Sequence, residues 1–553
     1  MRRPHNEPGG CHMIRPTASN LNGKTFDFLV IGAGITGAGV AQDAASRGYS
    51  TLLIDKGDFA SGTSSKSTKL IHGGLRYLAN LQVQVTRESL SERRLQQQLA
   101  PHMVWSLPFV IPCYRGSFFK NLKLKLGLFA YDLLAGFSNK TRHKTISPGE
   151  VLAHCPGISR AGLVGGLLYY DCRTDDARHV LEVILSAVQF GGRAANYMSM
   201  QRALKDASGK LIGAVLKDEL SGETLTVYAR QIVNATGVWS QATCKAAQSH
   251  FNGELLPSKG VHIALKRERL PVDSAVIIPS VHDDRFLFAV PWYDQVIVGT
   301  TDSGYKGDLD NPRVEPDEEL YILSAVNRLF PYLRLTSKDV CGRYAGLRPL
   351  VKKVGVQKTA DLSRQHSLEL SPERLLSISG GKLTTYRLMA KETVDLAQNQ
   401  ILKSLPGRKP VSCWTENLIL GGFNAGESVE SFKRSFERKA LALGLSAETA
   451  AYLTLVYGKR AEQVLDLVER DPHLAEPLVA GHPYILAQVL YAVRYEAAQS
   501  LGDVLSRRIR LSILDTNAAA VAADKAYALI AYELGWKDNE KESRLRSFRQ
   551  EME

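Results

Sequence analysis

The feature that most restricts the fold of this chain is a short apolar strand that runs directly into a glycine-rich turn. Residues 26–31 are apolar and rich in strand formers, and Gly32, Gly34 and Gly37 follow with GxGxxG spacing before a helical stretch at 36–47. Gly32 permits a tight turn, Gly34 lets the backbone approach a pyrophosphate, and Gly37 lets helix and strand pack closely. The pattern predicts a Rossmann-type dinucleotide site.

A second strand with an acidic residue at its end completes this unit. Residues 50–54 are typical of a strand, and Asp55 follows them, 21 positions after Gly34. Two strands joined through a helix imply a parallel sheet, and a carboxylate at this position can bind both ribose hydroxyls of an adenosine. The helix N-terminus offers free N–H groups to the phosphates. The fingerprint alone leaves NAD and FAD open.

Two later segments favour FAD. Residues 233–237, Val-Asn-Ala-Thr-Gly, are typical of a strand and turn that return to the cofactor, and residues 379–385 form a glycine turn that opens a helix. A helix N-terminus aimed at the flavin stabilises negative charge on the reduced ring. Either segment alone is also compatible with an ordinary helix start.

Length, charge and cysteine usage bound the rest of the chain. At 553 residues it is too long for a single core, and its net charge of +13 suits an anionic partner. The seven cysteines are scattered without a CxxC pair, so we expect neither a disulfide framework nor a metal site. No run of 18 apolar residues occurs, so no transmembrane helix is predicted.

From residue 26 to about 387 the chain resembles the D-amino-acid-oxidase-like flavoproteins. Several segments resemble the FAD-dependent glycerol-3-phosphate dehydrogenases more narrowly: GTSSKSTKLIHGGLRYL at 62–78, VGTTD at 298–302, YAGLRPL at 344–350, the 379–387 segment, YAVRYE at 491–496 and LSRR at 505–508. The resemblance implies FAD as cofactor, oxidation of sn-glycerol 3-phosphate to dihydroxyacetone phosphate, and a membrane quinone as electron acceptor.

These observations predict an α/β fold with three parts. We expect a discontinuous Rossmann-type FAD-binding domain over 25–405, with a mixed-sheet substrate domain inserted at roughly 240–345. An all-helical C-terminal domain should follow over 411–530. Residues 1–24 are expected to be a disordered leader and residues 531–553 a charged tail.

The resemblance also implies the site residues. Arg76 and Arg348 are expected to bind the substrate phosphate or polarise the oxygen at C2, Lys382 to contact substrate or flavin, and His262 to be the base or to orient the substrate. Structural ion pairs, or a buried histidine bonded to a carbonyl, are the plain alternatives. The expected cofactor-binding residues are Gly32, Gly34, Gly37, Asp55, Ser64, Ser65, His72, Gly73, Gly237, Gly380, Gly381, Leu383 and Thr384.

A basic amphipathic stretch indicates a membrane contact. Residues 115–144 carry seven basic side chains and one acidic, and an apolar stripe at helical spacing includes Phe118, Leu122, Leu126, Phe129 and Leu133, with Leu124 and Leu128 off the stripe. Such a helix can lie on anionic lipid, although a buried helix with solvated lysines is the alternative. We therefore expect a cytoplasmic protein held peripherally on the inner face of the cell membrane, and homo-oligomers remain possible.

Two other functions fit part of the sequence. A glycerol-3-phosphate oxidase of the same fold would differ only in using oxygen. An RNA-binding flavoprotein would use the basic charge for phosphates, but the basic residues lie among leucines and no RNP-like aromatic motif occurs. We therefore expect no nucleic-acid partner.

Overall fold

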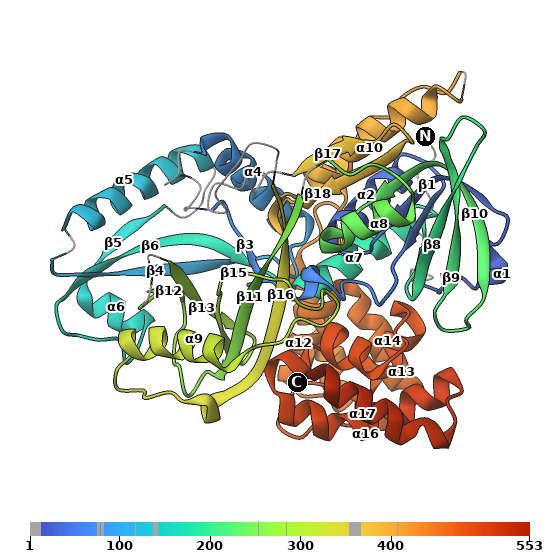
Figure 1. The fold of residues 1–553 in the computed structure, drawn as a ribbon. Helices are drawn as coiled ribbons and strands as arrows, with labels where there is room; N and C mark the ends of the chain where they lie inside the picture. Colours follow the sequence, from blue (N-terminus) through green and yellow to red (C-terminus); the bar gives the residue numbers. More distant parts are fainter. Residues whose placement is uncertain are drawn as a thin grey trace.

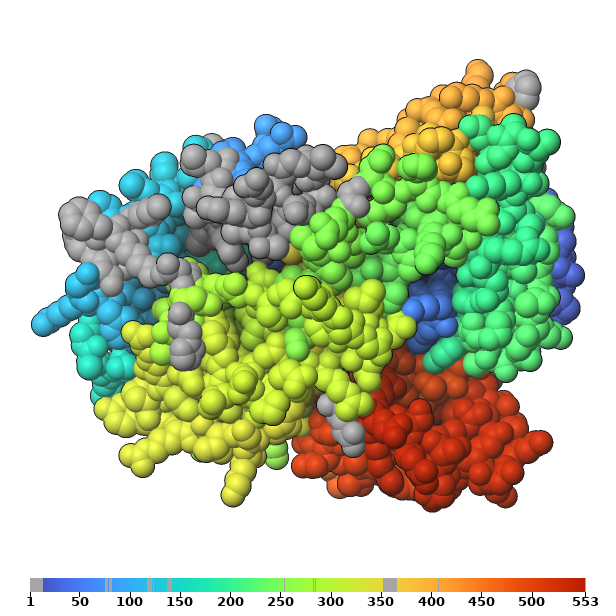
Figure 2. Space-filling view, in the orientation of Figure 1, coloured from blue at the N-terminus to red at the C-terminus, as the bar shows by residue number. Residues whose placement is uncertain are grey.

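The computed structural model describes residues 13–74, 78, 82–116, 118–136, 142–252, 254–281, 283, 285–352, 366–405 and 407–552. Two sheets lie next to each other, and a block of helices packs at one end beneath them (Figure 1). That block, red in the space-filling view, is formed by the C-terminal part of the chain (Figure 2). The predicted combination of a Rossmann-type sheet, a second mixed sheet and an all-helical C-terminal domain is confirmed.

The first sheet is built on the predicted strand–helix–strand unit. Its strands follow the order β17-β18-β10-β1-β2-β7, and β9 and β8 add to β10 in antiparallel fashion. β18, β10, β1, β2 and β7 are parallel, so their carboxyl ends meet at one edge. The bounds are β1 Thr25–Ile31, β2 Thr51–Ile54, β7 Arg193–Ala195, β8 Met198–Lys205, β9 Leu211–Asp218, β10 Thr224–Asn234, β17 Ser367–Leu370 and β18 Leu375–Ser379.

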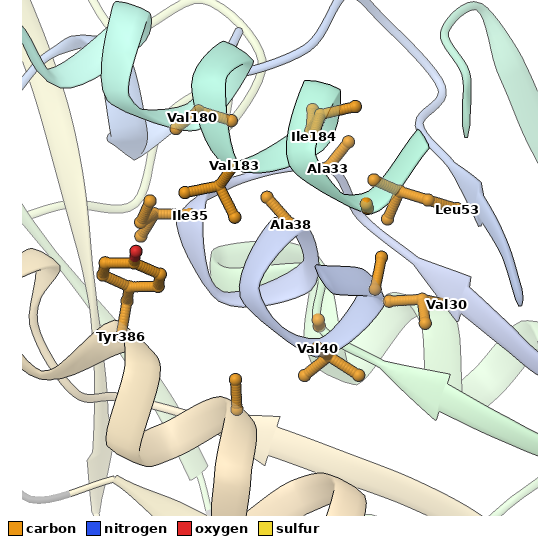
Figure 3. Packing of buried hydrophobic residues seen from close by; sticks show 14 of the residues in the cluster. Val30, Ala33, Ile35, Ala38, Val40, Leu53, Val180, Val183, Ile184 and Tyr386 are labelled. Carbon is orange, nitrogen blue, oxygen red and sulfur yellow. The ribbon is translucent and has the colours of Figure 1, made fainter. Parts of the chain in front are cut away.

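Small and β-branched side chains let three helices pack closely on this sheet. α2 (Ile35–Ser46) lies between α7 (Asp176–Gln189) and α10 (Tyr386–Leu402), and Figure 3 shows Ala38 and Val40 of α2 among side chains of the sheet and of both helices. Val40 is fully buried, which is worth about 1.5–3 kcal/mol. Gly39 brings α2 against α10, since a Cβ there would lie 2.9 Å from Tyr386 Cδ2.

Within the described residues the second sheet carries ten strands, in the order β15-β11-β14-β13-β12-β4-β6-β3, with β16 on β11 and β5 on β6. Their bounds are β3 Leu70–Ile71, β4 Trp105–Tyr114, β5 Lys144–Ile146, β6 Leu163–Arg173, β11 Glu254–Lys266, β12 Ala275–Pro279, β13 Phe286–Trp292, β14 Gln295–Gly299, β15 Ser303–Gly304 and β16 Val340–Lys352. The sheet therefore draws on residues 70–173 as well as on the 240–345 stretch expected from the sequence. The two stretches join where β4 pairs in parallel with β12.

The helices outside the first sheet complete these layers. Those around the sheets are α4 Val83–Leu99, α5 Phe118–Ala135, α6 Pro148–His154, α8 Ser240–Ala246 and α9 Pro316–Leu329. Those of the C-terminal domain are α11 Val429–Ala442, α12 Ala447–Tyr457, α13 Ala461–Arg470, α14 Leu486–Glu496, α15 Leu511–Leu514, α16 Thr516–Leu534 and α17 Lys541–Met552.

Buried ion pairs join the helical domain to the first sheet. Arg178 of α7 contacts Glu496 of α14 at 2.6 Å, with both side chains inaccessible to solvent. Arg508 pairs with Asp58, which follows β2. Breaking a buried pair of this kind costs about 3–5 kcal/mol, because it leaves an unpaired charge in the interior. The helical domain is thus bound tightly to the loop after β2.

Both ends of the described chain are more ordered than the sequence suggests. Met13 is buried in the core, and Arg15 donates from both terminal nitrogens to the Asp218 carboxylate at 2.7 and 3.0 Å. The expectation of a disordered leader is therefore wrong for residues 13–24, and residues 1–12 lie outside the described residues. At the other end α17 buries Leu545 and Phe548, so the charged tail is part of the helical domain.

Candidate functional site

The glycine turn after β1 has the close approach that its spacing predicts. Gly32 has a φ of +100°, and a Cβ on Gly37 would lie 1.8 Å from the carbonyl oxygen of Gly32. Only glycine fits at either position. The amide of Ile35, at the start of α2, donates to Ser64 Oγ at 2.9 Å. The turn and the N-terminus of α2 are thus arranged to receive a pyrophosphate.

Asp55 follows β2 and holds this turn in place through hydrogen bonds. Its carboxylate accepts hydrogen bonds from the amides of Ala33, at 2.6 Å, and Gly57, at 3.0 Å. Burial raises the pKa of Asp55 to about 6, although both amide bonds lower it. A dinucleotide ribose at this carboxylate would share it with the backbone.

A cavity of about 1220 Å³ runs along the carboxyl ends of the parallel strands. The turns after β1, β10 and β18 all line it, through Gly34, Gly237 and the pair Gly380–Gly381. These last three glycines have φ values of +60°, +75° and +79°. The cavity exceeds the usual volume of a small-ligand pocket, about 300–1,000 Å³, and the three turns meet at neighbouring strands. These residues fit an extended dinucleotide.

Most of the predicted cofactor residues reach this cavity, and the others lie behind it. Those that line it are Gly32, Gly34, Asp55, Ser64, His72, Gly237, Gly380, Gly381, Leu383 and Thr384. Gly37 shapes the turn from behind. The Ser65 carbonyl points away, accepting from Lys69 Nζ and Arg510 Nη2. The Gly73 amide donates to the Tyr131 hydroxyl oxygen at 2.9 Å.

The cationic end of the cavity lies at β16. Arg348 lines it, and its Nη2 donates to Thr300 Oγ1 at 2.9 Å and to the Thr301 carbonyl at 3.1 Å. Its Nη1 lies 3.2 Å from Asp302 Oδ1. Gly260 leaves room for the guanidinium, since a Cβ there would lie 2.5 Å from Nη2. The arginine fork is therefore held in one orientation at the cavity wall.

Of the two other predicted cationic residues, Lys382 belongs to the described part of the chain and Arg76 does not. Lys382 lines the cavity next to the glycine pair, with Nζ 3.4 Å from Ser89 Oγ. Arg76 lies outside the described residues, so its expected part in phosphate binding stays a prediction.

His262 lies behind a residue of the cavity wall, Thr68. Its ring is almost fully buried, stacks on Tyr344 with centroids 4.8 Å apart, and has Nε2 2.9 Å from Thr68 Oγ1. Thr68 lines the cavity, whereas His262 is not among the lining residues of the described chain. Burial, followed by the charges of Lys69 and Arg348, holds the pKa of His262 well below its usual value. The neutral ring can accept a proton through the threonine hydroxyl.

The cavity also has an apolar limb that the sequence did not reveal. Its lining residues come from β4, β6, β12, β13 and α5: Phe109, Ile111, Leu124, Tyr169, Ile277 and Phe288. Met198 and Met200 line the cavity as well, at the start of β8. The strands show only an apolar pattern in sequence, which is equally typical of a core, so nothing marked them as lining residues.

Helix α5 turns two different apolar faces in opposite directions. Leu126, Phe129 and Leu133 of the predicted stripe are 63%, 64% and 63% exposed, whereas Leu128 and Tyr131 are buried. Leu122 is also exposed, and the side chain of Phe118 lies outside the described residues. In Figure 1 the helix lies on the outer edge of the second sheet. Within the described residues, no helix combines the length and apolarity that a membrane crossing requires.

Comparison with known proteins gives this geometry a family. Residues 27–396 match the family described as "FAD dependent oxidoreductase", and residues 413–541 match "C-terminal domain of alpha-glycerophosphate oxidase". The chain is 35% identical over 527 residues to the aerobic glycerol-3-phosphate dehydrogenase of Bacillus subtilis (strain 168), covering 95% of this chain and 94% of that protein.

Solved structures agree with these matches. The glycerol-3-phosphate dehydrogenase from Bacillus halodurans, complexed with FAD, aligns with a TM-score of 0.80 and 32% identity, over 97% of this chain and 96% of that one. L-alpha-glycerophosphate oxidase from Mycoplasma pneumoniae, with FAD bound, aligns with a TM-score of 0.55 and 17% identity, over 68% of this chain and 95% of that one. The second likeness shows a shared fold.

Proposed function

This chain belongs to the FAD-dependent oxidoreductases and, within them, to the aerobic glycerol-3-phosphate dehydrogenases, and on that premise we propose that it oxidises sn-glycerol 3-phosphate to dihydroxyacetone phosphate and passes the electrons to a membrane quinone. Its cofactor is FAD. The observation that carries the proposal is that one cavity joins the glycine turns, a cationic wall and an apolar limb. FAD, when bound, accepts a hydride from the substrate and later releases the electrons.

The cationic wall suits a substrate that carries a phosphate dianion. Arg348 presents a guanidinium whose orientation is fixed by Thr300, Thr301 and Asp302, and a planar fork matches phosphate oxygens in a bidentate manner. Lys382 adds a second cationic group on the glycine-pair side of the cavity. The two side chains would hold the phosphate and place the C2 hydroxyl at a defined point in the cavity.

The proton of the C2 hydroxyl needs an acceptor in the protein. The Thr68 hydroxyl lies in the cavity wall and within hydrogen-bond distance of His262 Nε2. A proton can therefore pass from substrate to the Thr68 oxygen while the Thr68 proton passes to the neutral imidazole. This assignment makes His262 the base and Thr68 the residue that connects it to the substrate.

The apolar limb supports a lipid-soluble acceptor. A quinone carries an apolar tail and a planar ring, and the limb is lined by aliphatic and aromatic side chains. Leu124 of α5 forms part of that wall, so the limb lies beneath the helix that exposes the apolar stripe. The alternative acceptor, dioxygen, would need no limb of this kind.

The exposed stripe of α5 supports a peripheral position on the inner face of the cell membrane. Lys125 is exposed on the same helix as Leu126, Phe129 and Leu133, which gives the surface both apolar and cationic groups. Such a helix can bury its apolar side chains at the level of the acyl chains while its lysines meet anionic headgroups. A membrane contact here would bring the apolar limb close to the quinone pool.

The oxidation is tested by anaerobic reduction of the flavin. Purified holoenzyme is mixed with sn-glycerol 3-phosphate without oxygen, and the visible flavin absorbance is followed. We expect rapid bleaching, with colour restored by a soluble quinone much faster than by oxygen. Absorbance that stays unchanged would refute the substrate, and faster recovery with oxygen would favour the oxidase.

The membrane contact is tested with two matched double variants. Leu126→Glu with Phe129→Glu should abolish co-sedimentation with vesicles of anionic phospholipid while flavin bleaching persists, because only exposed side chains change. The control is Val521→Glu with Tyr532→Glu on α16, whose side chains are at least as exposed. Equal binding by both variants would contradict the assignment of α5.

A further inference from the structure

We propose that a second cavity, of about 490 Å³, binds a small soluble organic phosphate and is a regulatory site for the first cavity. It lies where the loop after β2, the second sheet and the C-terminal helices meet. In Figure 2 a patch of the blue N-terminal segment shows in a hollow where green, yellow-green and red surfaces meet. No part of the proposed oxidation uses this cavity.

Cationic side chains outnumber carboxylates around it. The basic lining residues are Lys66, Arg313, Arg343, Arg507, Arg510 and Arg544, and the acidic ones are Asp58, Asp310 and Glu551. Each of these carboxylates is paired with a cation: Asp58 with Arg507 and Arg508, Asp310 with Lys56, and Glu551 with Arg507, which it shares with Asp58. Arginines of the lining also pair with carboxylates outside it: Arg343 with Glu319, Arg507 with Asp503, Arg510 with Asp176 and Arg544 with Glu540.

Lys66 supplies the uncompensated charge. Its ammonium has neither a hydrogen bond nor an ion pair with any residue in the described part of the chain, and burial lowers its pKa. Lys66 is only partly buried, yet a cation without a partner in such a position is unfavourable, and a bound anion would stabilise it. The exposed Ser547 hydroxyl also lines the cavity and can donate a hydrogen bond to an anion there.

Apolar side chains in the same lining suit the carbon part of a ligand. Trp536 and Phe548 line the cavity, and the Arg544 guanidinium lies 3.8 Å from the Trp536 ring centroid. Apolar and cationic side chains in one lining favour an organic phosphate over a bare ion. Glu551 stands close enough to Lys66 to raise its pKa, so the carboxylate at the end of α17 opposes an incoming anion.

A shared wall connects this cavity to the first one. Gly57, Ser61 and Asp310 line both cavities. In the same segment, Ser64 Oγ accepts a hydrogen bond from the Ile35 amide at the start of α2, and the Ser65 carbonyl accepts one from Arg510. An anion at Lys66 would therefore change the position of a segment that lines the proposed flavin site. This coupling rests on the proposed function, whereas binding itself does not.

Binding is tested by calorimetry on the FAD-loaded protein, with inorganic phosphate and then glycerol 2-phosphate as probes. We expect Lys66→Met to weaken one class of binding site at least about tenfold, because the partner charge is gone. Lys338→Met, at an exposed lysine that does not line the cavity, is the control and should match the wild type. Identical isotherms for Lys66→Met and the control would overturn the proposal.

A second variant keeps the test decisive if Lys66→Met folds poorly. Glu551→Gln removes the opposing carboxylate and should tighten phosphate binding, and unchanged or weaker binding would overturn the proposal. Coupling is read from the flavin spectrum, which phosphate should perturb in the wild type and in Lys338→Met but not in Lys66→Met. Because calorimetry needs no substrate, a failure of flavin bleaching would leave the binding result intact.

Discussion

Replacing Arg348 by alanine tests the substrate assignment most directly. The guanidinium would make charge-assisted hydrogen bonds to the substrate phosphate, and truncating one partner of such a buried pair costs about 2–5 kcal/mol. Arg348 is a quarter exposed and shares its charge with Asp302, 3.2 Å away. Solvent and the neighbouring carboxylate both weaken the interaction, so the lower half of that range applies.

The expected loss is therefore about 2–3 kcal/mol, or about 30- to 150-fold in kcat/KM for glycerol 3-phosphate. FAD content should stay at the wild-type level, because Arg348 donates hydrogen bonds to Thr300, Thr301 and Asp302, which lie outside the three glycine turns. The assay is anaerobic flavin reduction over a range of substrate concentrations, with the ratio of visible to ultraviolet absorbance reporting bound FAD.

Two matched variants separate charge from geometry at this position. Arg348→Lys keeps the charge but loses the fork, so its kcat/KM should fall between those of wild type and Arg348→Ala. Asp302→Asn removes the competing carboxylate and should lower KM for the phosphate substrate. Loss of FAD from Arg348→Ala, or a kcat/KM within about threefold of wild type, would refute the reasoning.

Two further predictions concern the cofactor turn. Gly37→Val should lower bound FAD about tenfold or more, because a Cβ there would lie 1.8 Å from the Gly32 carbonyl oxygen; wild-type absorbance of the purified variant would contradict this. In the FAD-free protein the folded pKa of Asp55 is raised to about 6, whereas the pKa of an unfolded Asp is about 3.9. Asp55 therefore adds to the free energy of unfolding fully below about pH 3.9, and this contribution is lost as pH rises through about 6. The melting temperature of wild type should therefore fall relative to Asp55→Asn between these pH values, and parallel curves would show that Asp55 does not titrate there.

The local parts of the site could be predicted from the sequence. The turn at Gly32–Gly37 and the acid at Asp55 belong to one continuous unit, so their spacing alone fixes their geometry. The glycine pair at 380–381 is likewise a strand–turn–helix segment. The exposed stripe of α5 also followed from helical spacing, because a helix places residues three and four apart on one face.

Contacts between distant segments could not be predicted in the same way. β4 pairs with β12 across more than a hundred residues, and an apolar run carries no signal for its partner strand. Arg15 forms an ion pair with Asp218, so the segment around it is ordered and is not a disordered leader. Thr68 stands between His262 and the cavity because the loop before β3 lies against β11, an arrangement that no motif records.

The discontinuity of the first sheet has a consequence for synthesis of the protein on the ribosome. β1 and β2 emerge early, but β18, which carries the glycine pair, follows roughly 320 residues later, or about 15 to 65 seconds at ordinary translation rates. Until then the nascent chain displays a glycine fingerprint without the turn that completes its cavity. FAD therefore binds late in synthesis. Until then the early β1–α2–β2 segment exposes an apolar strand edge, because the strands that pair with it have not yet been synthesised.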